Sequence, residues 1–135
     1  MACDYAEARD HASEALATAR RIGSRFLEAN ALTELAKAAF ESRDYDAGLG
    51  LATDSAALWR AVGHVGGLCE ALRCVAAASA ALGDTVAARA AYEECLTIGR
   101  DTDDSSGECS ALVGLGQLAL ARGDTAAARD CLVEA

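Results

Sequence analysis

Apolar residues recur along the chain at spacings of three and four positions, in stretches separated by short polar or glycine-containing segments. This spacing places apolar side chains along one face of an α-helix, and the strict alternation typical of a half-buried β-strand is missing. The pattern therefore predicts an all-α fold of seven helices. They are expected at about 4–21, 25–41, 44–61, 65–82, 84–99, 105–121 and 124–134.

The breaks between these stretches have the chemistry of helix ends. At Gly83-Asp84 and Gly123-Asp124, the glycine can take the left-handed conformation that ends a helix, and the aspartate can accept backbone N–H groups at the start of the next one. Ser42-Arg43-Asp44 is expected to form the same turn without glycine. The other breaks are 22–24, 62–64 and the polar run 100–106.

An offset of 40 residues aligns the chain with itself three times. Asp4, Asp44, Asp84 and Asp124 fall in one column, and Leu32, Leu72 and Leu112 fall in another. Small residues recur at 8, 48, 88 and 128 and at 36, 76 and 116, where they would let neighbouring helices approach closely. We therefore expect one repeat domain over residues 1–135, in which each helix pair buries the apolar face of its neighbour.

The last copy of the repeat resembles the tetratricopeptide pattern. It reads Leu112-x-x-Leu115-Gly116-x-x-Ala119, then Gly123-Asp124, then Ala128-x-x-x-Leu132-x-x-Ala135. The family's common unit is 34 residues, and the 40-residue spacing is similar to the lengthened repeats of sensor arms in bacterial transcription regulators. The resemblance implies a right-handed α-solenoid of antiparallel helix pairs that serves as a scaffold for protein binding.

The resemblance also implies a concave groove lined by the first helix of each pair, here 25–41, 65–82 and 105–121. Positions one, four and eight beyond residues 29, 69 and 109 are then expected to project into it. These residues are Asn30, Thr33, Lys37, Glu70, Arg73, Ala77, Ser110, Val113 and Gln117. We expect Lys37 or Arg73 to clamp a carboxylate of a bound peptide. Two alternatives stay open: the face is only a solvated helix surface, or Arg73 pairs with Glu70.

The expected function is that of a protein–protein interaction module. The alternative is a ligand-sensing regulatory arm of a multidomain bacterial transcription regulator. Neither end of the chain supplies the polar capping helix that a solenoid needs. The chain is therefore expected to be a piece of a longer solenoid or to form a homodimer through an uncapped end.

Charge and composition exclude several other classes of partner. The formal net charge is −9 and Lys37 is the only lysine, which argues against a nucleic acid or an anionic membrane as partner. No apolar run approaches the roughly 20 residues that span a bilayer, and residues 1–20 are too acidic for a secretion signal, so we expect a cytoplasmic protein. Phosphate loops, zinc-protease motifs and nucleophile elbows are missing, and we expect neither catalysis nor a cofactor.

The six cysteines contain no C-x-x-C pair and no histidine at zinc-finger spacing. We expect them to serve as small core residues, with neither a metal site nor a disulfide. Cys69 and Cys109 lie one repeat apart, a separation of about 8–10 Å between packed helices, which exceeds disulfide reach. Trp59, the only tryptophan, is expected to be buried in the helix packing.

Overall fold

The computed structural model describes the backbone of residues 2–121 and the side chains of residues 6–120. Over this part the chain forms helices only, and each of them was predicted to within two residues at either end. They are α1 (Ala2–Ile22), α2 (Arg25–Glu41), α3 (Tyr45–Val62), α4 (Val65–Ala81), α5 (Thr85–Asp101) and α6 (Ser105–Ala121). The expected helix at 124–134 lies outside the described residues.

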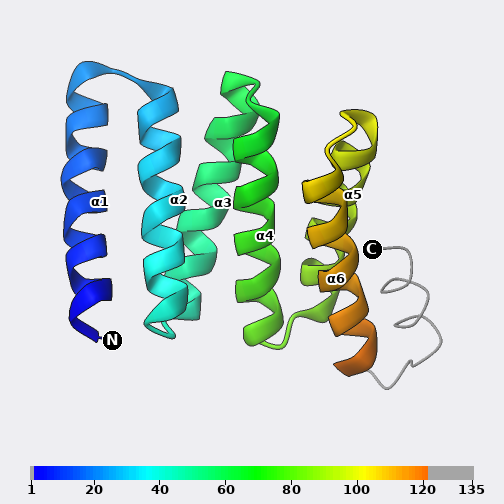
Figure 1. The fold of residues 1–135 in the computed structure, drawn as a ribbon. Helices are drawn as coiled ribbons and strands as arrows, with labels where there is room; N and C mark the ends of the chain where they lie inside the picture. Colours follow the sequence, from blue (N-terminus) through cyan, green and yellow to red (C-terminus); the bar gives the residue numbers. More distant parts are fainter. Residues whose placement is uncertain (1, 122–135) are drawn as a thin grey trace.

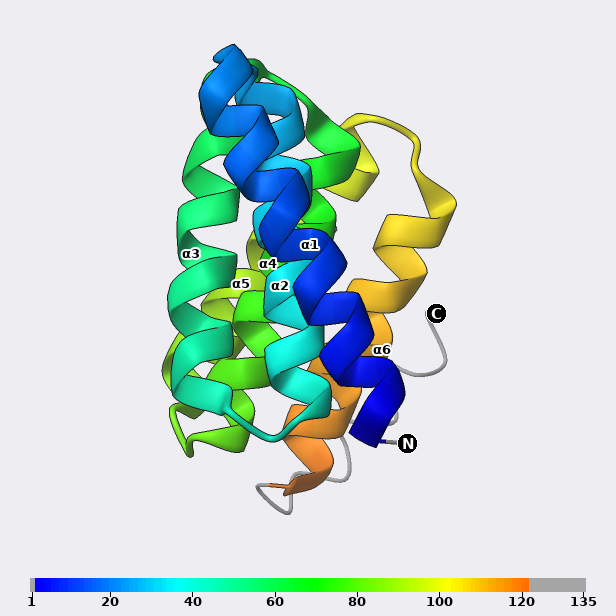
Figure 2. The same ribbon diagram turned by 90° about the vertical axis from the view of Figure 1, so that its left-hand side faces the viewer.

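The helices stack in chain order, each antiparallel to the one before it (Figure 1). The α1–α2, α3–α4 and α5–α6 turns lie at one end of the stack, and the α2–α3 and α4–α5 turns lie at the other (Figure 1). Helix α2 also contacts α4, and α4 contacts α6, whereas α1, α3 and α5 do not contact one another within the described residues. The three even-numbered helices therefore share one face of an open stack, and Figure 2 views this stack from the α1 end.

All five described turns have the same construction, repeated every 20 residues. One residue takes a left-handed backbone conformation, with φ between 55° and 87°, at Gly23, Arg43, Gly63, Gly83 and Asp103. The N–H of the next residue then bonds back to the carbonyl five positions earlier, as in Asp84 N to Ser79 O at 2.8 Å. Arg43 and Asp103 take this conformation although they carry a Cβ, which confirms that the 42–44 segment forms the turn without glycine.

At four of the five turns, the side chain after the left-handed residue caps the following helix. Ser24, Asp44, His64 and Asp84 each accept the backbone N–H three residues further on. At His64 the acceptor is Nδ1, which receives the N–H of Gly67 at 2.9 Å. Local turn chemistry therefore sets both ends of the helices, and this explains the accuracy of the predicted helix boundaries.

Small residues line the contacts between helices, as the repeat columns predict. Ala36, Ala76 and Gly116 are buried, and so are Leu32, Leu72 and Leu112 between them. Gly48 and Ala88 are buried as well, but Ala8 of the same column is exposed. The described contacts of α1 are with α2 alone, so the outer side of α1, where Ala8 lies, has no neighbour among these residues.

The four cysteines whose side chains are described divide into two groups. Cys69 and Cys95 are buried as expected, with the Cys95 thiol donating to the carbonyl of Cys69 at 3.8 Å. Burial, reinforced by the neighbouring Cys69, raises the pKa of Cys95 to about 12. Cys74 is half-buried and Cys109 is exposed, so the expectation of a core role is wrong for Cys109. Cys109 is equivalent in the repeat to Ala29 and Cys69. Each of those two residues is contacted by the helix that follows it, through Ser55 and Cys95 respectively. The helix expected to follow α6 lies outside the described residues.

Candidate partner-binding face

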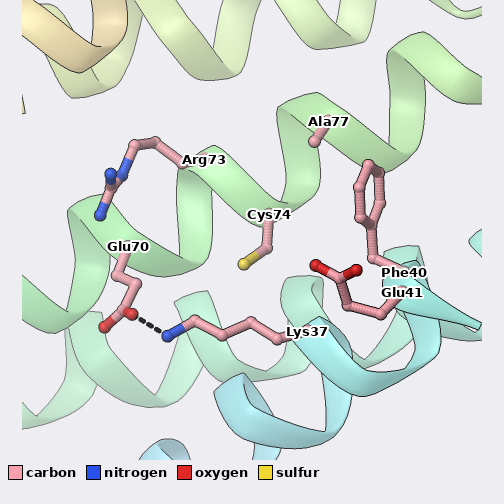
Figure 3. A pocket seen from close by; sticks show the side chains of 7 residues that line it. All are labelled: Lys37, Phe40, Glu41, Glu70, Arg73, Cys74 and Ala77. Atoms are coloured by element: carbon pink, nitrogen blue, oxygen red, sulfur yellow. Dashed lines mark hydrogen bonds and ion pairs between the residues drawn. The ribbon is translucent and has the colours of Figure 1, made fainter. Parts of the chain in front are cut away.

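A pocket of about 360 Å³ opens between α2 and α4, on the face that the even-numbered helices share. Its lining residues are Lys37, Phe40, Glu41, Glu70, Arg73, Cys74 and Ala77. In Figure 3, Phe40, Ala77 and the Glu41 carboxylate lie at one end, and Lys37, Glu70 and Arg73 lie at the other. The pocket therefore offers an apolar surface beside groups of both charges.

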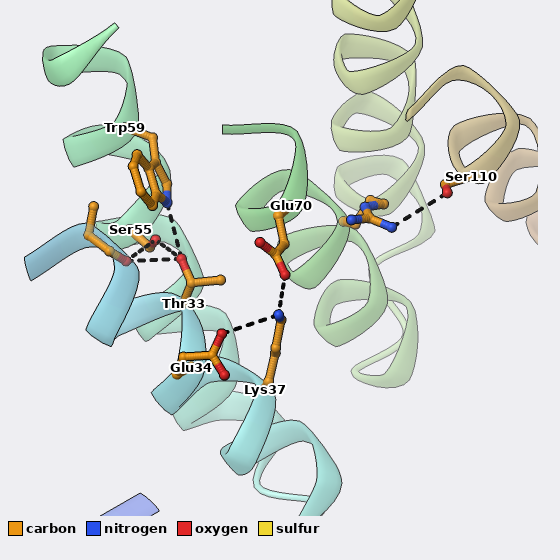
Figure 4. A network of polar contacts seen from close by, with 9 residues as sticks. Thr33, Glu34, Lys37, Ser55, Trp59, Glu70 and Ser110 are labelled. Carbon is orange, nitrogen blue, oxygen red and sulfur yellow. Dashed lines mark hydrogen bonds and ion pairs between the residues drawn. The ribbon is translucent and has the colours of Figure 1, made fainter. Parts of the chain in front are cut away.

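Lys37 and Glu70 meet across the α2–α4 interface. Their side chains form an ion pair (Figures 3 and 4), and the Lys37 ammonium also lies 3.3 Å from Glu34 (Figure 4). Partial burial lowers the pKa of Lys37, but the hydrogen bond and charge of Glu70, joined by Glu34, outweigh it and raise the pKa above its ordinary value. Because two carboxylates already neutralise Lys37, its geometry favours joining α2 to α4 over clamping a ligand.

Arg73 reaches towards α6. Its guanidinium donates to the Ser110 hydroxyl at 3.4 Å, and no ion pair with Glu70 forms among the described residues. The expected alternative of an Arg73–Glu70 pair is therefore wrong, because Glu70 binds Lys37. A guanidinium has five N–H donors, so the single long bond to Ser110 leaves most of the donors of this exposed side chain available.

Thr33 does not project into the groove, and this expectation was wrong. Its side chain is buried, at 1% exposure, and its hydroxyl donates to the carbonyl of Ala29 at 2.9 Å. The hydroxyl also contacts that of Ser55 and accepts the indole N–H of Trp59 at 3.1 Å (Figure 4). Ser55 donates to Ala29 as well, at 2.9 Å. Thr33 therefore joins α2 to α3, and the prediction that Trp59 is buried is confirmed.

The other four predicted positions lie on the same three helices but do not line the pocket. Asn30 and Gln117 are exposed, while Ser110 and Val113 are half-buried. None of these four lines the pocket, although Ser110 joins the polar contacts through Arg73. The structure thus brings together Lys37, Glu70, Arg73, Ala77 and Ser110 and leaves the rest apart.

Sequence reasoning missed three residues of the pocket, namely Phe40, Glu41 and Cys74. The signal was present, because Phe40 and Glu41 follow Lys37 by three and four positions, and Cys74 follows Glu70 by four. Such spacings place side chains on the same helix face. Burial raises the pKa of the Cys74 thiol, so this group is poorly suited to act as a thiolate nucleophile. The described residues contain no group of three or more side chains arranged to hold a metal ion.

Comparison with known protein families finds a match to the tetratricopeptide repeat family over residues 67–135. The matched segment covers just over half of the chain and runs from the first turn of α4 to the last residue. The chain belongs to the tetratricopeptide repeat family. Members of this family are in general scaffolds for protein–protein interaction and not enzymes. A search among curated proteins finds no match, and no helix among the described residues is long and apolar enough to cross a membrane.

Proposed function

We propose that this tetratricopeptide repeat chain is a protein–protein interaction module that binds a peptide or a partner helix across α2, α4 and α6. The observation that carries the proposal is the pocket between α2 and α4, which lies on the face that these three helices share. It combines an apolar surface with an exposed arginine, and binding grooves for peptides typically join apolar anchor pockets to a few orienting polar groups.

The contacts on this face favour a particular kind of segment. An apolar side chain would fill the space between Phe40 and Ala77, and a carboxylate next to it would bind Arg73, which is the exposed cation of the pocket without an ion-pair partner among the described residues. Arginine binds a carboxylate through two parallel N–H groups, which would orient the segment as well as hold it. The Lys37–Glu70 pair would keep α2 and α4 in register beneath the ligand.

The proposal can be tested with a library of random peptides selected on the immobilised protein. Selected peptides should share an apolar residue close to an acidic one, and Ala77→Trp, which fills the pocket, should weaken binding about tenfold or more. Arg73→Gln should weaken it about tenfold, and the matched change Arg89→Gln on α5, away from this face, should leave it unchanged. Circular dichroism checks that each variant is folded. Peptides that bind Ala77→Trp and Arg73→Gln as tightly as the parent protein would refute the groove.

The volume of the same pocket also favours a second candidate, a small-molecule sensor. Ligand pockets in proteins begin at about 300 Å³, and this pocket has about 360 Å³. A regulatory arm would then respond to a small carboxylate bound at Arg73. A library of small carboxylic acids, followed by thermal shift, distinguishes the two, because a sensor should be stabilised by one of them and that stabilisation should be lost in Arg73→Gln.

A further inference from the structure

Exposed large apolar side chains gather at one end of the helix stack. Eight such side chains are exposed within the described residues, and five of them lie in or beside the α1–α2 and α3–α4 turns, with exposures from 38% to 61%. We call these five residues the turn edge; they are Ile22, Phe26, Leu27, Val62 and Val65. The two turns lie at the same end of the molecule (Figure 1), and α2 packs against both α3 and α4.

The turn edge rests on a fixed aromatic base. The ring of Phe26 lies edge-on to Trp59, with centroids 5.1 Å apart, and to His64, at 5.4 Å. Trp59 is buried, and His64 is held by its bond from the N–H of Gly67. Phe26 therefore links the α1–α2 turn to the α3–α4 turn, while 45% of its surface stays exposed. A partner would meet a preorganised apolar surface, which reduces the entropic cost of binding.

Arginines surround this surface. Arg20 pairs with Glu28 at 3.3 Å and Arg60 pairs with Glu94, while Arg21 and Arg25 are exposed and make no ion pair within the described residues. The first turn of α4 carries no acidic residue. The part of the edge at the α1–α2 turn therefore has a local excess of positive charge, in a chain whose net charge is −9. The acidic α5–α6 turn lies at the same end of the stack, on the other side of the α3–α4 turn (Figure 1).

We propose that the turn edge binds an acidic amphipathic segment of another protein, with its apolar side chains on Ile22, Phe26 and Val65 and its carboxylates at Arg21 and Arg25. We choose an acidic partner because its carboxylates would complement the positive charges of Arg21 and Arg25. A peptide experiences the charges within about 8–10 Å of where it lies, whereas a bilayer faces the whole acidic protein. A second copy is disfavoured, because the acidic α5–α6 turn, with Asp101, Asp103 and Asp104, has none of the exposed large apolar side chains.

The turn edge is separate from the pocket between α2 and α4. Phe26 and Lys37, the pocket residue nearest to it along α2, are 11 positions apart, a distance of about 16 Å at the helical rise of 1.5 Å per residue. Val65 lies closer to the pocket, five positions before Glu70 on α4. The variants used in the test are at Arg21 and Ile22 on α1, which does not contact α4 within the described residues, so they should leave binding at the pocket unchanged. The two proposals can fail independently.

The test uses a fluorescein-labelled helical peptide of about 16 residues, with leucines along one face and Asp and Glu beside them. Fluorescence anisotropy should show binding that Ile22→Asp or Arg21→Glu weakens about tenfold or more. Matched controls on other surfaces, Val86→Asp for the apolar change and Arg9→Glu for the charge change, should leave the affinity within about twofold. Val86 is the most exposed of the large apolar side chains that the structure describes, at 79%, and Arg9 lies on the same helix as Arg21.

Three results would overturn the proposal. The first is a failure of the peptide test. A peptide in which Asn and Gln replace the acids binds as tightly as the acidic one, or the acidic peptide does not bind at concentrations up to about 1 mM. The second is binding to vesicles of phosphatidylcholine and phosphatidylserine that Arg21→Glu abolishes, without binding of the peptide. The third is a dimer in light scattering that Ile22→Asp converts to a monomer, which would assign the edge to a second copy.

Discussion

Replacing Thr33 with valine removes a hydroxyl without changing the shape of the side chain, and it tests whether this residue joins two helices or faces a ligand. In the native protein the hydroxyl accepts the indole N–H of Trp59 and donates to Ala29. In Thr33→Val the indole N–H loses its acceptor inside the protein, while Ser55 keeps its own bond to Ala29. A buried donor without an acceptor costs about 1–3 kcal/mol.

We therefore expect Thr33→Val to lower the free energy of unfolding by about 1–2 kcal/mol, after part of the cost is offset by burial of the added methyl group. Urea unfolding followed by circular dichroism measures the change, which corresponds to a fall of about 4–8 °C in melting temperature. The matched control is Thr53→Val on α3. That exposed hydroxyl bonds only to Leu49 of its own helix, so the change should stay within about 0.5 kcal/mol.

A double mutant isolates the bond to the indole. Phenylalanine has no N–H, so in a Trp59→Phe background Thr33→Val should cost about 1 kcal/mol less than it does in the parent protein. Equal costs in the two backgrounds would show that the indole bond contributes nothing to stability. A Thr33→Val variant as stable as the parent but deficient in peptide binding would return this residue to the groove and refute the reasoning.

Three further predictions follow from the packing, the turns and the buried thiols. A Cβ at Gly67 would lie 2.4 Å from the ring of Trp59, so Gly67→Ala should destabilise by up to about 2 kcal/mol, whereas Gly50→Ala, with open space around it, should stabilise by about 0.5–1 kcal/mol in urea unfolding. Arg43, at φ 63°, should gain about 0.5–1 kcal/mol on replacement by glycine, and an unchanged melting temperature would contradict this. Because the pKa of Cys95 is raised from 9.0 to about 12, the folded state keeps a proton that the unfolded state loses. The free energy of unfolding should therefore fall as the pH rises from 9 to 12. In Cys95→Ala the free energy of unfolding should fall less steeply with pH, by up to about 1.4 kcal/mol per pH unit. Parallel plots of unfolding free energy against pH for the two proteins would rule this out.

The candidate site was less predictable than the helices, because it depends on pairs of residues far apart in sequence. Lys37 and Glu70 were each expected on the groove face, yet the ion pair between them could not be read from their spacing. Thr33 and Arg73 occupy equivalent positions of the repeat, but one is buried and the other exposed. Ser55 and Trp59 provide Thr33 with hydrogen-bonding partners on the neighbouring helix, whereas the long side chain of Arg73 extends to Ser110.

The amino-acid order alone determined the helices, their ends and the repeat, because these depend on interactions within a few residues: apolar spacing along one helix face, a left-handed residue at each turn and a capping side chain after it. Only the tertiary structure decided which of two equivalent positions is buried, which carboxylate neutralises Lys37, and that Phe26 of one turn lies against His64 of the next. Those outcomes depend on how far each side chain reaches across the gap between helices and on which side chains of the neighbouring helix it meets there. The partner side chains are 20 to 40 positions away in the sequence.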